Sequence, residues 1–192
     1  SLIIERTSSN ALTWEPSYTT SLQKNTISGW FQMSIFGSTQ TLFSTAQDST
    51  SSDYFVIYTA GDQLRVYNRS DTQNSRNAVN VVINSKIRDP SGWYHFVVVL
   101  DSTLATASDR VKIYINGIRQ LDLVVNATDW PSLNYNFHFP PSTAASPSWN
   151  IGRAVFTGPY YGDHFGGNVS QFYVIDGQAL GPEDFGYTDP LT

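Results

Sequence analysis

The 192-residue sequence contains no cysteine. Disulfide frameworks, cysteine-ligated zinc sites and thiol catalysis are therefore excluded. Charged residues are also few, at 14% of the chain, and Lys and Arg form no cluster. Because a nucleic-acid-binding protein needs a basic surface to neutralise phosphates, the net charge of −5 argues against that class. No apolar run approaches the length of a transmembrane helix, so we expect no membrane insertion.

The sequence also lacks the short motifs that mark common active sites. It contains no G-x-S-x-G hydrolase motif, no phosphate-binding G-x-x-x-x-G-K-S/T loop and no H-E-x-x-H zinc motif. A glycosidase with a sandwich fold needs two carboxylates that face one cleft. No expected strand has acids at positions i and i+2, and Glu183 and Asp184 are neighbours in a terminal turn. We therefore expect that the protein is not an enzyme.

Residues that favour β-structure are abundant, and aromatic residues make up 14% of the chain. They occur in short runs separated by clusters of Gly, Asp, Ser and Thr, which is typical of strands and turns. The runs are 26–36, 41–45, 54–59, 64–68, 77–83, 89–101, 110–123, 149–156 and 168–175. This pattern predicts an all-β fold, a two-sheet antiparallel β-sandwich with minimal helix, in a single domain over residues 1–192.

Two of these runs give the clearest local predictions. In 89–101, a Pro/Gly turn precedes a segment whose two alternating faces are both largely apolar, so we expect a central strand covered on both sides. His95 lies inside it and is expected to be a core or near-core residue. In 110–123, alternating apolar residues lead into Asn116-Gly117, which suits a type I′ turn and predicts a β-hairpin.

After Asn126 the regular pattern stops, and aromatic residues crowd into two irregular segments. Long irregular segments are uncommon unless they are functional or disordered. Aromatic rings stack on sugar rings, and nearby polar side chains bond to hydroxyls, so these segments are candidates for binding carbohydrate. The alternative is that the same rings cap one end of the sandwich or pack against a neighbouring subunit. The candidate residues are Trp130, Tyr135, Phe137, His138, Tyr160, Tyr161 and His164.

We predict no cofactor, with bound Ca²⁺ as an alternative. Calcium takes several oxygen ligands from carboxylates and backbone carbonyls. Asp163 with nearby loop carbonyls is one candidate ligand set, and Asp101 with Asp109 is another. Neither pattern is specific to calcium, and ordinary solvated loop carboxylates are the favoured interpretation of these residues.

Several motifs, taken in order, resemble a known family. They are S-G-W-F (28–31), Q-T-L-F-S (40–44), L-R-V-Y (64–67), R-D-P-S-G-W-Y-H (88–95), R-V-K-I-Y-I-N-G (110–117), N-I-G-R (150–153) and I-D-G-Q-A-L-G-P-E-D-F-G (175–186). Together they are similar to laminin-G/pentraxin-like domains of the concanavalin A-like jelly-roll superfamily, and more narrowly to a bacteriophage version of that domain. The last motif resembles the closing device of the family, in which Leu180 and Phe185 fold a short turn back over the sandwich.

The resemblance implies a non-catalytic structural module on the surface of a phage virion, such as a tail fibre, spike or capsid decoration. It also implies many copies or a homo-oligomer, and it is compatible with one module of a longer protein. We expect this module to bind carbohydrate on the host surface. The alternative is a decoration module that contacts neighbouring virion subunits without binding sugar. Relatives often have Phe-Asp-Gly where this chain has Phe165-Gly166-Gly167, which argues against a metal ligand there.

Overall fold

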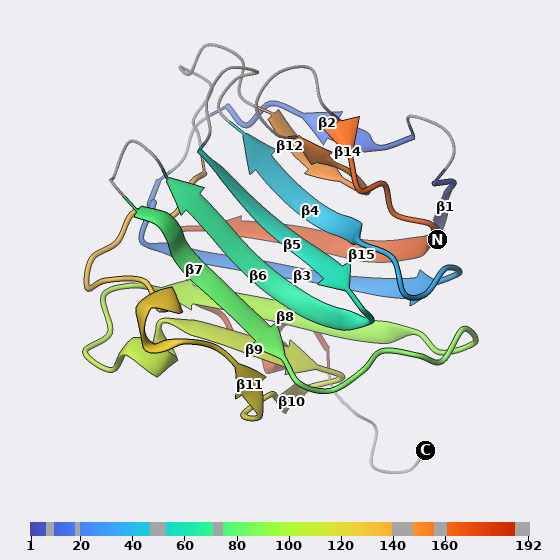
Figure 1. Cartoon of the computed structure of the whole chain (residues 1–192). Coiled ribbons are helices and arrows are strands. Elements are labelled where there is room, and N and C mark those ends of the chain that lie inside the picture. The colour runs from blue at the N-terminus through green and yellow to red at the C-terminus, as the bar shows by residue number, and fades with distance from the viewer. Residues whose placement is uncertain are drawn as a thin grey trace.

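The computed structural model describes residues 1–6, 10–17, 20–46, 53–70, 75–139, 148–155 and 161–186. These residues form two antiparallel sheets of six and seven strands, packed face to face, and a separate two-stranded ribbon (Figure 1). The predicted all-β sandwich is therefore confirmed. Within the described ranges no helix is long and apolar enough to cross a lipid bilayer. The helical elements are the 3₁₀ turns η1 (Ala107–Asp109), η2 (Ala127–Asp129) and η3 (Pro182–Asp184).

Strand order places segments that are distant in the sequence side by side. The six-stranded sheet has the order β1 (Leu2–Ile4), β15 (Gly167–Asp176), β3 (Lys24–Met33), β8 (Tyr94–Asp101), β9 (Val111–Ile115) and β10 (Ile118–Arg119). The seven-stranded sheet, in front in Figure 1, has the order β11 (Leu123–Val124), β7 (Ser75–Ile83), β6 (Gln63–Ser70), β5 (Tyr54–Ala60), β4 (Gln40–Ala46), β12 (Ser148–Ile151) and β2 (Leu12–Trp14). The ribbon pairs β13 (Ala154–Val155) with β14 (Tyr161–Gly162).

The expected long strands are present, although their ends differ by a few residues. The expected run 149–156 is divided into β12 and β13, because Gly152 between them has a φ of +89° that interrupts the strand. The expected run 110–123 is divided into β9 and β10, joined by the predicted hairpin turn, and ends at the first residue of β11. The edge strands β1 and β2 were not predicted, because three residues are too few to show an alternating pattern.

The core lies between the two sheets and consists of their inward-facing side chains. Its largest fully buried members are phenylalanines from both sheets, including Phe31 and Phe96 on one side and Phe43 and Phe55 on the other. Because successive side chains of a strand point to opposite faces, the same strands direct another set of side chains away from the core. The outer faces are therefore defined by the register of the strands.

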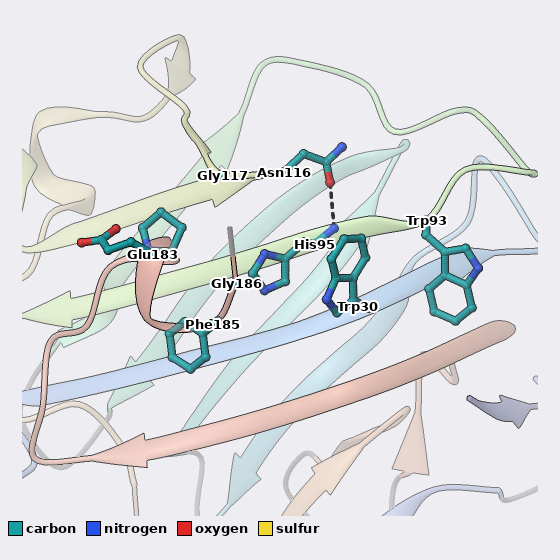
Figure 2. A pocket seen from close by; sticks show the side chains of 9 residues that line it. Trp30, Trp93, His95, Asn116, Gly117, Glu183, Phe185 and Gly186 are labelled. Atoms are coloured by element: carbon teal, nitrogen blue, oxygen red, sulfur yellow. Dashed lines mark hydrogen bonds between the residues drawn. The ribbon is translucent and has the colours of Figure 1, made fainter. Parts of the chain in front are cut away.

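Strand β8 is covered on both faces, as predicted. Phe96, Val98 and Leu100 point into the core and are fully buried, and His95 and Val97 on the outer face are buried as well. The outer face of β8 lies against the C-terminal segment that includes η3 (Figure 2). Central position and double coverage together account for the continuous apolar run in the sequence.

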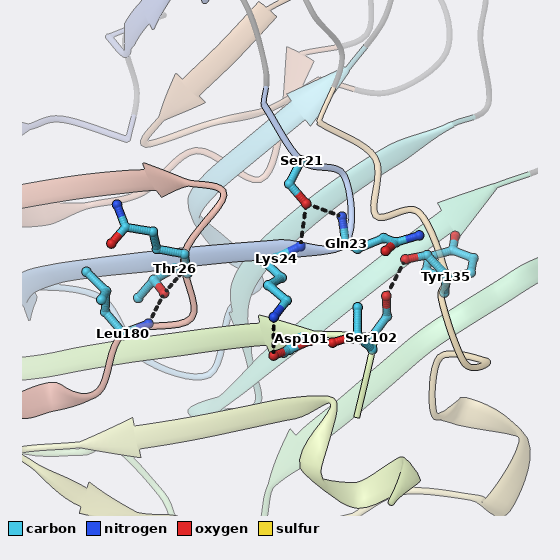
Figure 3. A network of polar contacts seen from close by, with 10 residues as sticks. Ser21, Gln23, Lys24, Thr26, Asp101, Ser102, Tyr135 and Leu180 are labelled. Atoms are coloured by element: carbon cyan, nitrogen blue, oxygen red, sulfur yellow. Dashed lines mark hydrogen bonds and ion pairs between the residues drawn. The ribbon is translucent and has the colours of Figure 1, made fainter. Parts of the chain in front are cut away.

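The C-terminal segment folds back over the outer face of the six-stranded sheet. Thr26 Oγ1 on β3 accepts a hydrogen bond from the Leu180 backbone N–H at 2.8 Å and donates to the Gln178 carbonyl at 2.8 Å (Figure 3). The ring of Phe185 lies 5.8 Å, centroid to centroid, from that of Tyr173 on β15. The closing turn expected from the sequence motif is thus present.

Two hairpins turn through pairs of residues with positive φ. Asn116 (φ +50°) and Gly117 (φ +78°) join β9 to β10, which confirms the predicted hairpin. Gly61 (φ +55°) and Asp62 (φ +66°) join β5 to β6 in the same way. Such turns match the twist of the paired strands and fix their register.

Candidate functional site

The structure places two of the predicted site residues, Tyr135 and Phe137, in the core. They are 5% and 1% exposed, respectively. The Tyr135 hydroxyl accepts a hydrogen bond from Asn68 Nδ2 at 3.0 Å, and its carbonyl accepts one from Ser102 Oγ at 2.7 Å (Figure 3). These two rings pack inside the sandwich, as in the alternative to sugar binding, because a buried ring cannot stack on a sugar. Sequence pattern alone did not separate the two roles, since both require aromatic residues.

Trp130 and His138 are half-buried and lie apart from each other. Trp130 packs against the core beside Leu123 and Val125, near the edge formed by β9 and β11. The His138 backbone N–H donates to Asn68 Oδ1 on β6 at 2.8 Å. The irregular segment therefore packs Tyr135 and Phe137 together in the core and leaves Trp130 and His138 at its margin.

The second predicted segment is described in part. Tyr160 lies outside the described residues, and Tyr161 is placed as a residue of β14 without a described side chain. Asp163 has a φ of +50°, and its carbonyl accepts a hydrogen bond from the Thr41 backbone N–H at 2.7 Å. Burial raises the pKa of the Asp163 carboxyl. Burial, helped by nearby arginine charges, lowers the pKa of His164.

The outer face of the seven-stranded sheet has a group of tyrosines that are not among the predicted site residues. Strand alternation directs Tyr54 and Tyr58 of β5 and Tyr67 of β6 away from the core, and all three are half-buried. The rings of Tyr54 and Tyr67 lie 5.8 Å apart. We call the surface formed by these three tyrosines and the outward side chains beside them the tyrosine face.

A hollow of about 430 Å³ lies on the tyrosine face. Val56, which is 3% exposed, lies between two of the tyrosines along β5. Asp163, from the segment before β15, lies at the same hollow and is the one carboxylate among its described lining residues. The lining residues are Thr39, Thr41, Tyr54, Val56, Tyr58, Ala60, Arg65, Tyr67 and Asp163.

Arginine and tyrosine side chains hold each other in place here. Arg65 Nη1 donates to the Tyr58 hydroxyl at 3.1 Å, and the guanidinium carbon lies 5.5 Å from the centroid of the same ring. Arg69 makes a side-chain hydrogen bond to Tyr54. Burial, together with the neighbouring Tyr67, raises the pKa of Tyr54 to about 12, so its hydroxyl keeps its proton at neutral pH.

Three buried polar atoms of the tyrosine face have no hydrogen-bond partner within the described part of the chain. They are Thr41 Oγ1, Arg65 Nε and Asn80 Oδ1. Thr41 lies opposite Tyr58, and Asn80 lies opposite Tyr67, so all three belong to the same surface. Most buried polar atoms in native proteins are paired, and an unpaired group often marks a functional role or a bound water or ion. Thr41 and Arg65 line the hollow, and Asn80 lies on the same face beside Tyr67, which makes the tyrosine face the principal candidate site.

A second hollow, of about 590 Å³, lies on the opposite side of the molecule, against the six-stranded sheet (Figure 2). Trp30 stacks on His95 there with ring centroids 4.9 Å apart, and Phe185 from the C-terminal segment lies beside them. His95 is bonded through Nε2 to Ser28 Oγ at 2.8 Å, and its backbone N–H donates to Asn116 Oδ1 at 2.8 Å. Because these polar groups bond to one another, this hollow is the weaker candidate.

Neither proposed calcium ligand set is a cluster of acids. Asp101 accepts hydrogen bonds from Thr103 and lies 3.4 Å from Lys24 Nζ (Figure 3), whereas Asp109 pairs with Arg119 at 2.7 Å. Across the described ranges, no three His, Asp or Glu residues lie together as a metal-binding group. Calcium binding at Asp163 stays a prediction.

The tyrosine face could have been found from the sequence by combining two signals. In Y-F-V-I-Y-T-A and Q-L-R-V-Y-N-R, tyrosines and arginines alternate with Phe, Ile, Leu and Val. A Gly-Asp pair between the runs predicts a two-residue hairpin, which places the tyrosines of both strands on one face. The more apolar set then belongs to the core, and the tyrosines and arginines face outward.

Comparison with known proteins gives one family match. A profile of the concanavalin A-like lectin/glucanases superfamily matches residues 6–184. No match was found among curated protein sequences. The superfamily level of the sequence resemblance is thereby confirmed, whereas its bacteriophage version is supported by the motifs alone.

Solved structures with a similar fold come from several kinds of protein. A heptameric SAP-like pentraxin from Limulus polyphemus aligns with a TM-score of 0.58 and 16% identity, over 93% of this chain and 76% of that chain. The CBM40 of Ruminococcus gnavus IT-sialidase, solved with α2,3-sialyllactose, aligns with a TM-score of 0.58 and 14% identity, over 91% and 95%. The NanB sialidase of Streptococcus pneumoniae aligns with a TM-score of 0.59 and 16% identity, over 95% of this chain and 26% of that chain. At these identities the likeness shows the fold.

Proposed function

The chain belongs to the concanavalin A-like lectin/glucanases superfamily, and on that premise we propose that it is a non-catalytic carbohydrate-binding module whose site is the tyrosine face. The observation that supports this most directly is the meeting of three half-buried tyrosine rings with two unpaired buried polar atoms, Thr41 Oγ1 and Arg65 Nε, at one hollow. A sugar ring presents C–H groups to an aromatic face and hydroxyls to polar atoms, so one ligand satisfies both. The hollow has the size of ordinary small-ligand sites.

The proposal that the module is non-catalytic is supported by the number of carboxylates described around the hollow. Glycoside hydrolysis ordinarily uses a pair of carboxylates on either side of the scissile bond. Among the described lining residues, Asp163 is the one carboxylate. The alignment with NanB covers 26% of that sialidase, whereas the alignment with the CBM40 covers 95% of that module. Both observations favour a binding module.

We propose the surface of a bacteriophage particle as the setting, on the basis of the sequence motifs. A module present in many copies gains avidity when several copies bind at once, so each single site needs little affinity. Host-surface glycan is the ligand that this setting supplies.

A second candidate function, assembly with neighbouring subunits, is supported by a separate surface. Ile118, Leu121 and Val124 are 69%, 77% and 55% exposed, and they lie on or between β10 and β11, the edge strands of the two sheets. Exposed apolar side chains grouped in this way are typical of contact surfaces. A concentration-dependent increase in mass that Leu121→Glu abolishes would favour this function.

The test of carbohydrate binding is a glycan array probed with the purified, multivalently displayed protein. Saturable binding that Tyr67→Ala weakens and Trp93→Ala leaves unchanged would support the tyrosine face. Trp93 lines the opposite hollow, so the reverse result would move the site there. Trp130→Ala tests the segment predicted from sequence, and a parallel arm with chelator tests calcium. Absence of binding to any glycan in every arm would reject the proposal.

A further inference from the structure

The tyrosine face includes two arginines, although the chain as a whole is acidic. The net charge is −5, yet two arginines of β6, Arg65 and Arg69, flank Tyr67 on this face. Arg65 lines the hollow, where Asp163 is the one described carboxylate. Neither arginine makes a salt bridge to Asp163, and Arg6 and His164 are the charged groups that act on that carboxyl. Arg65 therefore forms no salt bridge with a carboxylate in the described part of the chain.

The contacts of Arg65 fix the guanidinium and leave most of its hydrogen-bonding capacity unused. A guanidinium has five N–H donors, and the described protein groups accept one of them, through the Tyr58 hydroxyl. Nε is buried without a partner, so the group is held in a partly desolvated position. Stacking against the Tyr58 ring restricts its orientation further. Such a pre-positioned, under-bonded arginine suits a ligand with two acceptor oxygens in a plane.

A neutral sugar does not account for this arrangement as well as an acidic one. Hydroxyls bond to uncharged groups such as Thr41 and Asn80, which lie on the same face. Hydrogen bonds between arginine and an anion are roughly twice as strong as those between neutral groups, and arginine matches carboxylate or sulfate oxygens as a fork. Arg65 therefore adds a preference that the neutral groups do not supply.

We propose that the tyrosine face binds glycans bearing an acidic group, with a carboxylate or sulfate on Arg65 and the sugar ring against the tyrosines. This inference depends on the proposed carbohydrate-binding function and adds the class of ligand. Asp163 supports the orientation, because its carboxylate accepts sugar hydroxyls and repels the acidic group toward Arg65. A carboxylate and a sulfate ester share the required chemistry, and the experiment separates them.

The experiment compares wild type with Arg65→Gln and Arg65→Lys on an array that pairs neutral glycans with their carboxylated and sulfated counterparts. We expect acidic members to bind at least about tenfold more tightly than their neutral partners. Arg65→Gln should remove that preference and leave residual binding to the ring. Arg65→Lys should retain part of it, because the charge remains but the fork is lost. The acidic group, carboxylate or sulfate, that increases the affinity of the wild-type protein more over the neutral glycan identifies the preferred acid.

The matched control is Arg119→Gln, which removes one positive charge from the β10 edge, away from the tyrosine face. It should change neither affinity nor preference. Equal binding of neutral and acidic glycans, unaffected by Arg65→Gln, would overturn the acidic-ligand inference and leave the carbohydrate proposal standing. Absence of binding to every glycan would reject both. If Arg65→Gln does not fold, a salt titration of wild type decides, because added salt weakens charge-dependent binding selectively.

Discussion

Arg65 and Tyr58 face each other across the β5–β6 hairpin, with Arg65 Nη1 bonded to the Tyr58 hydroxyl at 3.1 Å and the guanidinium over the ring. The Gly61-Asp62 turn sets the register of the two strands, because its two positive φ values define a two-residue hairpin with a fixed pairing. A one-residue slip of either strand would move its own side chain to the core face and so separate the pair. The turn therefore determines the geometry of the candidate site from a distance.

Tyr58→Phe should weaken ligand binding without unfolding the protein. The substitution keeps the ring but removes the acceptor that holds Arg65 Nη1. Loss of one such hydrogen bond corresponds to about 1 kcal/mol, or roughly fivefold in affinity. Calorimetric titration with the best array ligand measures this, and Tyr173→Phe on the opposite sheet is the control. Equal affinities of Tyr58→Phe and wild type would contradict the positioning role.

Gly167→Ala should be strongly destabilising. Gly167 has a φ of +152°, and an added Cβ would collide with the backbone carbonyl oxygen of Gln32 on β3. We expect a loss of about 3 kcal/mol or more in the free energy of unfolding. Gly37→Ala is the matched control, because Gly37 also has positive φ but open space around its Cα, so about 1 kcal/mol is expected. Urea unfolding compares the two, and similar losses would refute the steric explanation.

Arg110→Lys should destabilise the protein much more than Arg119→Lys. Buried Arg110 donates through three separate nitrogens to the carbonyls of Leu104, Ala105 and Pro131 at 2.7–2.8 Å. The single ammonium group of a lysine cannot reach all three carbonyls. We expect a cost of about 2–4 kcal/mol. Arg119 forms an exposed pair with Asp109, for which about 0–1 kcal/mol is expected. Thermal unfolding decides, and a small effect at Arg110 would contradict this account.

Stability should fall as the pH is lowered through the range in which histidine titrates. Burial lowers the pKa of His95 in the folded protein below its usual 6.5, so the unfolded chain takes up the proton first. The neutral form is therefore favoured by folding, and its contribution is complete above about pH 6.5 and is lost progressively below it. His164, whose pKa is also lowered by burial, acts in the same direction.

Unfolding free energies of wild type and His95→Gln from about pH 7.5 to about pH 5 test this expectation. Glutamine keeps a polar group near Ser28 but does not titrate, so the variant should show a shallower decline. Part of the slope should remain because His164 is unchanged. Parallel curves for the two proteins would show that His95 does not contribute.

Local sequence chemistry was enough to predict the long strands, the Asn116-Gly117 hairpin and the doubly covered strand β8. Each of these depends on residues that are close in sequence, through alternation or turn preferences. The closing turn at Leu180 was expected from the family resemblance. The edge strands β1 and β2 could not be predicted, because their partners, and not their own residues, hold them in the sheet. Tyr135 and Phe137 were assigned to a binding loop because aromatic composition is the same for a site and a core.

The sequence by itself determined that the protein is an all-β sandwich, because strand alternation and turn residues act over a few positions. Only the tertiary structure decided which aromatic residues are buried and which line a hollow. That distinction depends on the stacking of two sheets, and it brings Thr41, Arg65, Asn80 and Asp163 to one surface from four separate parts of the chain. Contacts between such distant residues follow from packing, which no local pattern encodes.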